Sequence, residues 1–142
     1  MRIVLDTNVL VSAFVFPGGA PETVYRLAVE ERLELITSRP LLAEFGRVLS
    51  EKFDAPRAAT EAVAQIASIA TVVDPTQEVA VIADDPEDNR VLEAALESRA
   101  EVTVSGDRHL LRLKSWQGVR IVSPADFLAE DARHREQRQI PG

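Results

Sequence analysis

Four acidic residues, far apart in the chain, have the types and positions expected of a divalent-cation site. Asp6 and Asp107 each follow a short apolar run. Asp88 begins a helical pattern, and Glu44 lies within an earlier one. In an open α/β sheet, ligands bind outside the carboxyl ends of the parallel strands, so these acids are expected to converge. Carboxylate oxygens suit Mg²⁺ or Mn²⁺, and we predict Asp6, Asp88 and Asp107 as metal ligands, with Glu44 as a further ligand or a residue that positions water.

Each acid also has an ordinary structural interpretation. Asp6 and Asp107 are favoured helix N-caps, and Asp88 is a first-turn acid that the helix dipole favours. Glu44 lies at the edge of an apolar helical stripe, where acids often reach out to water. The crowding of acids over residues 84–88 favours function for Asp88, because two carboxylates about 4 Å apart repel by roughly 4 kcal/mol at an effective dielectric of about 20. Asp85 is predicted to cap the helix that follows.

Composition limits the class of protein. The 142 residues are 46% apolar and 27% charged, as expected of one globular domain. No run approaches the roughly 18 apolar residues of a membrane span, no signal peptide precedes the first strand, and cysteine is absent, so a cytoplasmic location is expected. The net charge of -7 is weak evidence against a nucleic-acid substrate, because Lys and Arg drive phosphate binding.

Strand patterns alternate with helix patterns along the chain. This order predicts an α/β fold, a three-layer α/β/α sandwich around a central, mainly parallel sheet. The domain is predicted to span residues 1–129, and the polar residues 130–142 are predicted to form a flexible tail. Strands are expected at residues 3–5, 33–37, 71–73, 102–104 and 118–122, and helices at 7–14, 21–31, 39–52, 57–70, 86–99, 109–113 and 124–129.

These motifs resemble a PIN-domain nuclease over about residues 2–128. The motifs are Ile3-Val4-Leu5-Asp6-Thr7-Asn8-Val9-Leu10, Glu44 in the helix after Ser38-Arg39-Pro40, Asp85-Pro86-Glu87-Asp88-Asn89, Val104-Ser105-Gly106-Asp107 and the closing run Val119–Leu128. More narrowly, the chain resembles VapC-like toxins of bacterial and archaeal toxin–antitoxin pairs. The resemblance implies a sheet of about five strands and a Mg²⁺- or Mn²⁺-dependent endoribonuclease that hydrolyses RNA, forms a homodimer and is silenced by a cognate antitoxin.

The resemblance also assigns roles to individual residues. It implies Asp6, Glu44, Asp88 and Asp107 as the catalytic acids, with Asn8 and Ser105 as supporting or substrate-binding residues. The additional acids Asp84 and Asp85 depart from the family pattern and leave open which acid of that run serves the site. Recruitment of RNA by so acidic a chain would depend on local cations, for which the candidates are Arg39, Arg47, Arg90, Arg108 and Lys114.

Proteins of other classes remain alternatives. A haloacid-dehalogenase-like phosphatase needs a second Asp two residues after the first, where this chain has Asn8. A response-regulator receiver needs a Lys after a late strand, where this chain has Asp107. An inactive PIN-like scaffold or binding module is the remaining alternative, and the intact set of acids argues against it. The RNA target, the cleavage preference and the number of metal ions stay open.

Overall fold

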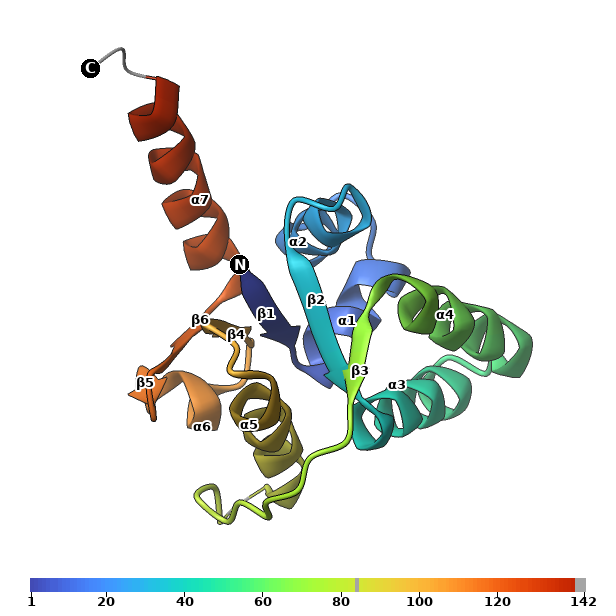
Figure 1. The fold of residues 1–142 in the computed structure, drawn as a ribbon. Coiled ribbons are helices and arrows are strands. Elements are labelled where there is room, and N and C mark those ends of the chain that lie inside the picture. The colour runs from blue at the N-terminus through green and yellow to red at the C-terminus, as the bar shows by residue number, and fades with distance from the viewer. Residues whose placement is uncertain (84, 140–142) are drawn as a thin grey trace.

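The computed structural model describes residues 1–83 and 85–139 and contains a six-stranded sheet at its centre (Figure 1). The strand order is β3-β2-β1-β4-β6-β5. The first five strands of this order run parallel to one another, and β5 pairs antiparallel with β6. The strands are β1 (Arg2–Leu5), β2 (Glu34–Ser38), β3 (Thr71–Val73), β4 (Val102–Val104), β5 (Ser115–Trp116) and β6 (Val119–Val122).

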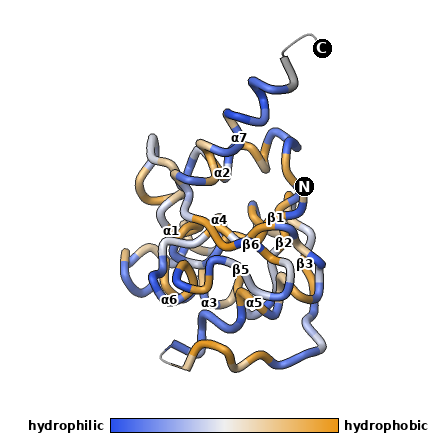
Figure 2. Tube along the Cα trace, turned by 90° about the vertical axis from the view of Figure 1, so that its left-hand side faces the viewer, coloured by the Kyte–Doolittle hydropathy of each residue, from blue (hydrophilic) through white to orange (hydrophobic). Residues whose placement is uncertain are grey.

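Helices cover both faces of this sheet. They are α1 (Thr7–Val15), α2 (Ala20–Val29), α3 (Arg39–Lys52), α4 (Pro56–Ile69), α5 (Pro86–Ser98), α6 (Arg108–Leu111) and α7 (Pro124–Gln139). Ile3 and Leu5 of β1 pack into a core formed with α1 to α4, whereas Val4 packs into a second core formed with α5 and α6. Because successive side chains of a strand point to opposite faces, this alternation defines the predicted three-layer α/β/α sandwich. Figure 2 shows the hydrophobic strands gathered between the helices.

The order in which the chain adds strands to the sheet reverses at β1, and a ligand site is expected at this point. The chain passes from β1 outward to β2 and β3 on one side, and then returns to place β4 on the other side. Val4 pairs with both Ile36 of β2 and Thr103 of β4. The carboxyl ends of β1 and β4 are therefore neighbours, at the topological switch point where open α/β sheets bind ligands.

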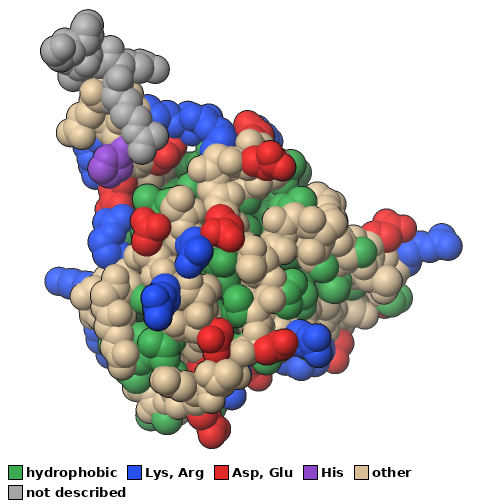
Figure 3. Space-filling view, viewed as in Figure 1, with side chains coloured by type: hydrophobic (Ala, Val, Ile, Leu, Met, Phe, Trp, Pro, Cys, Tyr) green, Lys and Arg blue, Asp and Glu red, His purple; other side chains and the backbone are tan. Residues whose placement is uncertain are grey.

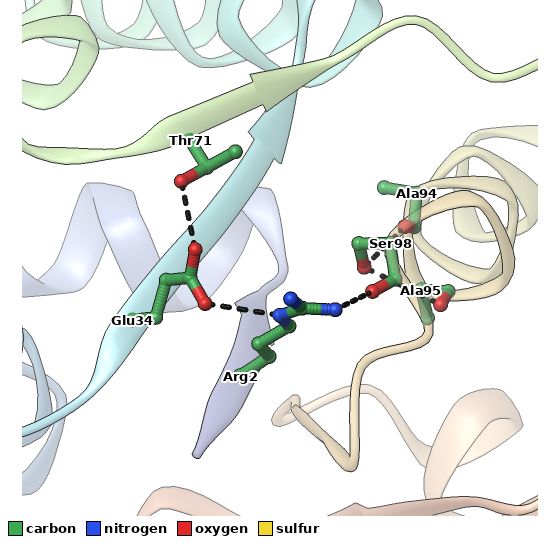
Figure 4. Close-up of polar contacts among 6 residues, drawn as sticks. All are labelled: Arg2, Glu34, Thr71, Ala94, Ala95 and Ser98. Atoms are coloured by element: carbon green, nitrogen blue, oxygen red, sulfur yellow. Dashed lines mark hydrogen bonds and ion pairs between the residues drawn. The ribbon is translucent and has the colours of Figure 1, made fainter.

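At the other end of the strands, hydrogen bonds around Arg2 link the amino ends of β1, β2 and β3 (Figure 4). The Arg2 guanidinium donates to Glu34 Oε2 and to the Ser98 carbonyl, both at 3.0 Å. The Thr71 hydroxyl donates to Glu34 Oε1 at 3.1 Å. These bonds join β1, β2, β3 and the end of α5, and they hold these elements together at the amino end of the sheet.

The predicted elements match the observed ones closely, with two differences. The short edge strand β5 was not predicted, because two residues carry no periodic pattern. The last helix was expected to end near Ala129, and this was wrong: α7 continues to Gln139. Its outer half extends away from the sheet (Figure 1) and is stabilised by an Arg135–Asp131 ion pair of 3.0 Å at helical i,i+4 spacing. Glu130 of α7 also forms an ion pair with Arg120 of β6 at 2.7 Å.

The residues between β3 and α5, numbers 74–83 and 85, form an irregular connection that we call the β3–α5 segment. Val79 and Ile82 of this segment are buried in the core beside α5. In Figure 2 the segment is visible as the partly hydrophobic stretch along the lower edge. Within the described ranges, every helix is too short or too polar to cross a lipid bilayer.

Candidate metal centre

Asp6 lies directly after β1, and its carboxylate is held by two donors. The residue is only 3% exposed. Its Oδ1 accepts the Val9 amide at 3.0 Å as the N-cap of α1, and its Oδ2 accepts a hydrogen bond from the Ser105 hydroxyl. The cap interpretation of Asp6 is therefore confirmed. The cap leaves the carboxylate at the carboxyl end of the sheet, because the backbone amide of Asp6 bonds to the Val104 carbonyl at 3.1 Å.

Ser105 joins the first and last of the predicted acids. Its fully buried hydroxyl donates to Asp6 and accepts the backbone amide of Asp107 at 2.9 Å. Asp107 also caps α6, since its Oδ1 accepts the His109 amide at 2.7 Å. A single hydroxyl thus fixes the separation between the acid after β1 and the acid after β4.

Asp88 lies in the first turn of α5 and completes a group of three carboxylates. Oxygen atoms of Asp85, Asp88 and Asp107 all lie within 4.8 Å of one another. Asp88 is 8% exposed, and its Oδ2 is buried without a hydrogen-bond partner. A buried charged oxygen without a partner costs free energy unless a cation or proton neutralises it, so this atom is suited to coordinate a cation.

The proton affinities of these acids reflect their crowding. Burial, together with the charges of Asp107, Asp85 and Asp6, raises the pKa of Asp88 to about 7. Burial also raises the pKa of Asp6, although the hydrogen bonds from Ser105 and Val9 oppose that rise. Without a cation, Asp88 therefore tends to retain its proton up to near neutral pH.

Asp85 was predicted as a helix cap, with its part in the site left open, and in the structure it does both. The cap is confirmed: its Oδ1 accepts the Glu87 amide at 3.1 Å. Its carboxylate also belongs to the group with Asp88 and Asp107, which Asp6 does not join among the described residues. The density of acids around Asp88 was the sequence signal for this, while Asp84 lies outside the described residues.

Glu44 reaches the same place from α3, which begins directly after β2. It lines a small cavity of about 30 Å³ together with Asp6, Thr7, Asn8, Asp85, Glu87, Asp88 and Val91. Burial and the neighbouring Glu87 carboxylate raise the pKa of Glu44 to about 7, against the opposing effects of Thr7 and Arg47. Glu44 therefore faces the cavity, but its charged neighbours are Glu87 and Arg47 rather than the three aspartates. Glu87 was not predicted from the sequence.

The cavity and its lining can admit a divalent cation held by carboxylates. Its volume exceeds the roughly 10–15 Å³ that a cavity needs to hold one water-sized group. The donors are carboxylate oxygens, which Mg²⁺ and Mn²⁺ prefer over nitrogen or sulfur. A larger cavity of about 330 Å³ lies between α2 and α7, and none of the predicted site residues lines it.

Several of the predicted basic residues are engaged in ion pairs. Arg39 pairs with Asp74 at 3.4 Å, Arg47 with Glu87 at 3.9 Å and Arg90 with Glu93 at 2.9 Å. Of these, Arg47 is the one paired with a residue that lines the acidic cavity. On the face shown in Figure 3, acidic and basic side chains are interspersed, so the negative charge of the chain does not form one continuous patch there.

The sheet topology and the acidic group define an α/β protein with a candidate divalent-cation centre at its switch point. A model of the PIN domain matches residues 2–109, and the chain therefore belongs to the PIN domain family. The predicted resemblance is confirmed, and the match gives no support to the phosphatase or receiver alternatives. PIN domains are generally nucleases that use divalent metals, so membership supports a hydrolase activity.

Similar proteins include a sequence relative and several solved structures. An uncharacterised protein of Methanocaldococcus jannaschii is 27% identical in an alignment of 143 positions, gaps included, that covers 92% of this chain and 91% of the relative. VapBC2 from Rickettsia felis, bound to a DNA fragment from its promoter, matches with a TM-score of 0.62 and 16% identity over 85% of this chain and 97% of that one. PAE2754 from Pyrobaculum aerophilum matches with a TM-score of 0.60 and 20% identity, covering 94% and 99% of the two chains.

VapBC-1 from nontypeable Haemophilus influenzae gives a TM-score of 0.58 at 15% identity, covering 88% of this chain and 99% of that one. At such low identities, the likeness to these three solved structures establishes the shared fold.

Proposed function

We propose that this protein is a Mg²⁺- or Mn²⁺-dependent endoribonuclease that hydrolyses phosphodiester bonds in RNA. The observation that carries the proposal is the group of carboxylates at the switch point, with an unpartnered, buried oxygen on Asp88. Membership in a family of nucleases supports the reaction class. We assign the activity to residues 1–129.

In this proposal Asp88 and Asp107 hold the cation, with Asp6 and Asp85 completing the oxygen shell. When bound, a divalent cation polarises the scissile phosphate and lowers the pKa of a coordinated water. Asp6 can contribute although both its oxygens accept hydrogen bonds, because each carboxylate oxygen has a second lone pair. Ser105 orients Asp6 and Asp107, and Asn8, exposed on the cavity lining, contacts the substrate.

We assign Glu44 the role of general base. Its pKa of about 7 lets it accept a proton from an attacking water near neutral pH, and it lines the cavity without belonging to the group of aspartates. A group whose pKa lies near the working pH is an efficient general base. Arg47, which pairs with Glu87 beside this cavity, is the cation best placed to meet a phosphate.

We further propose that the protein is the toxin of a toxin–antitoxin pair and acts as a cytoplasmic homodimer. The motifs that resemble VapC-like toxins support this, and two of the similar solved structures are VapBC assemblies. The inactive-scaffold alternative predicts no catalysis, so one activity assay separates the two proposals.

The test is cleavage of a mixed-sequence, fluorescently labelled RNA by the purified protein with Mn²⁺, with Mg²⁺ and with excess EDTA. We expect cleavage in either metal, none in EDTA, and a loss of at least 100-fold in Asp88→Asn and in Asp107→Asn. Glu61→Gln is the matched control, because it removes one carboxylate from an exposed position on α4. Cleavage that persists in EDTA, or in both site variants, would refute the proposal. Cutting of single-stranded DNA in preference to RNA would correct the substrate.

The toxin role has its own test. The product of a gene adjacent to this one should co-purify with the chain and suppress cleavage at equimolar ratio. If no adjacent gene encodes a small DNA-binding protein and expression does not slow growth, the toxin assignment fails while the nuclease assignment stands.

A further inference from the structure

The β3–α5 segment forms a regular series of hydrogen bonds with α5. Three side chains of α5, spaced four residues apart, each accept a backbone amide from the segment, and these amides are spaced three residues apart. The pairs are Asn89 with Ile82, Glu93 with Val79 and Glu97 with Thr76, each at 2.8 Å. Because residues four apart share one face of a helix, the segment runs antiparallel along that face.

Asn89 both accepts and donates a hydrogen bond in this series. Besides accepting the Ile82 amide, its Nδ2 donates to the Ile82 carbonyl at 2.7 Å. Both residues are buried, with exposures of 3% for Asn89 and 7% for Ile82. Buried polar groups that lose their partners cost about 1–3 kcal/mol each, so this two-way bond strongly favours one position of the segment.

The attachment lies next to the acidic group on both sides. Asn89 follows Asp88 directly in α5, and Ile82 lies three residues before Asp85 in the sequence. Three residues of chain span at most about 10 Å, so fixing Ile82 restricts where Asp85 can lie. Mutual repulsion drives these carboxylates apart when no cation is bound, and the Asn89 bond opposes that separation.

We propose that Asn89 is a positioning residue, which holds Asp85 beside Asp88 and so sets the cation affinity of the centre. The inference rests on the proposed function only in taking the acidic group to bind a divalent cation. Side chains that orient metal ligands without contacting the metal change affinity by 10–100-fold when they are removed.

Glu97 provides a matched control within the same series. It also accepts one backbone amide of the segment, but it lies eight residues further along α5, or about 12 Å at the helical rise. A general loosening of the segment would affect both ends, whereas a positioning role belongs to Asn89 alone.

The test measures Mn²⁺ affinity from the electron paramagnetic resonance signal of the free ion, using the full chain. We expect Asn89→Ala to weaken affinity by 10–100-fold and Glu97→Ala by less than about threefold. In an Asp85→Asn background, Asn89→Ala should have little further effect, because two residues that act through one contact are not additive. Equal losses with and without the Asp85 carboxylate would overturn the inference.

A second variant guards against misfolding of Asn89→Ala. Asn89→Asp keeps the acceptor for the Ile82 amide and replaces the donor with an oxygen. If the added charge of Asn89→Asp were its only effect, Mn²⁺ binding would become tighter. Under the proposal, the lost donor displaces Asp85, and Mn²⁺ binding should become weaker. Tighter binding by Asn89→Asp overturns the positioning role. If the unsubstituted protein binds Mn²⁺ but cuts no RNA, the proposed function fails while these affinities still decide the role of Asn89. If it binds no Mn²⁺, both fail.

Discussion

Replacing Asp88 by Asn should make the metal-free protein more stable, although it removes a residue that we assign to the catalytic site. Asn has the same shape as Asp but carries no charge. In the absence of a cation, Asp88 is buried among Asp6, Asp85 and Asp107, and its Oδ2 has no hydrogen-bond partner. The substitution removes both the desolvation cost and the repulsion.

The size of the gain follows from the pKa. Burial and neighbouring charges raise the pKa of Asp88 from 3.8 to about 7. At about 1.36 kcal/mol for each pKa unit, that difference corresponds to at most roughly 4 kcal/mol, and because the acids share the effect we expect about 1–3 kcal/mol. A carboxyl with a raised folded-state pKa costs nothing below its unfolded pKa near 4. Its cost grows as the pH rises toward 7 and is complete above it, so the stabilisation by Asn should be largest at pH 8.

The assay is urea denaturation in EDTA at pH 5 and at pH 8, with free energies extrapolated to water. Asn at position 88 should exceed the unsubstituted protein by about 1–3 kcal/mol at pH 8 and by clearly less at pH 5. The exposed control Glu61→Gln should change stability by less than about 0.5 kcal/mol at either pH. A loss of stability at pH 8, or a gain that does not depend on pH, would refute the reasoning about charge crowding.

Three further predictions test other parts of the structure. Ser105→Ala should lower Mn²⁺ affinity about 10-fold, measured by calorimetry, because Asp6 and Asp107 lose their shared hydroxyl. Ser68→Ala, at an exposed position on α4, should leave that affinity unchanged. Phe45→Ala should destabilise the protein by about 3–5 kcal/mol in urea titration, because Phe45 is fully buried against Phe14, and a change below 1 kcal/mol would contradict this packing. Cleavage by the unsubstituted protein should rise with pH through about 7, following deprotonation of Glu44, and Glu44→Gln should abolish that rise; an unchanged profile would remove Glu44 from proton transfer.

Much of the fold could be predicted because the local signals agree with one another. The continuous apolar strands, the Pro residues in first helical turns and the Ser38 cap each indicate an element boundary. The true end of α7 was missed because polarity was taken as a sign of disorder, although Glu, Ala, Arg and Gln are all good helix formers. Its support from β6, through the Arg120–Glu130 pair, is a tertiary contact that no local pattern reveals.

Most members of the candidate site could be predicted, but Glu87 and the arrangement of the acids could not. The strand ends that carry Asp6 and Asp107 become neighbours because a parallel α/β sheet places them at one edge. Whether Asp85 joins Asp88 and Asp107 depends on how the β3–α5 segment docks on α5. That docking is governed by Asn89 and Ile82, and the sequence gives no sign that these two residues are partners.

The central claim is that separate acids converge to hold one kind of ion. The most direct measurement is the anomalous scattering of Mn²⁺ in crystals of the protein grown with that ion. We expect a peak between Asp88 and Asp107, with carboxylate oxygens at about 2.0–2.3 Å, and loss of the peak in Asp88→Asn. Ordered crystals without a peak at these aspartates, or with Mn²⁺ bound only elsewhere on the surface, would contradict the account.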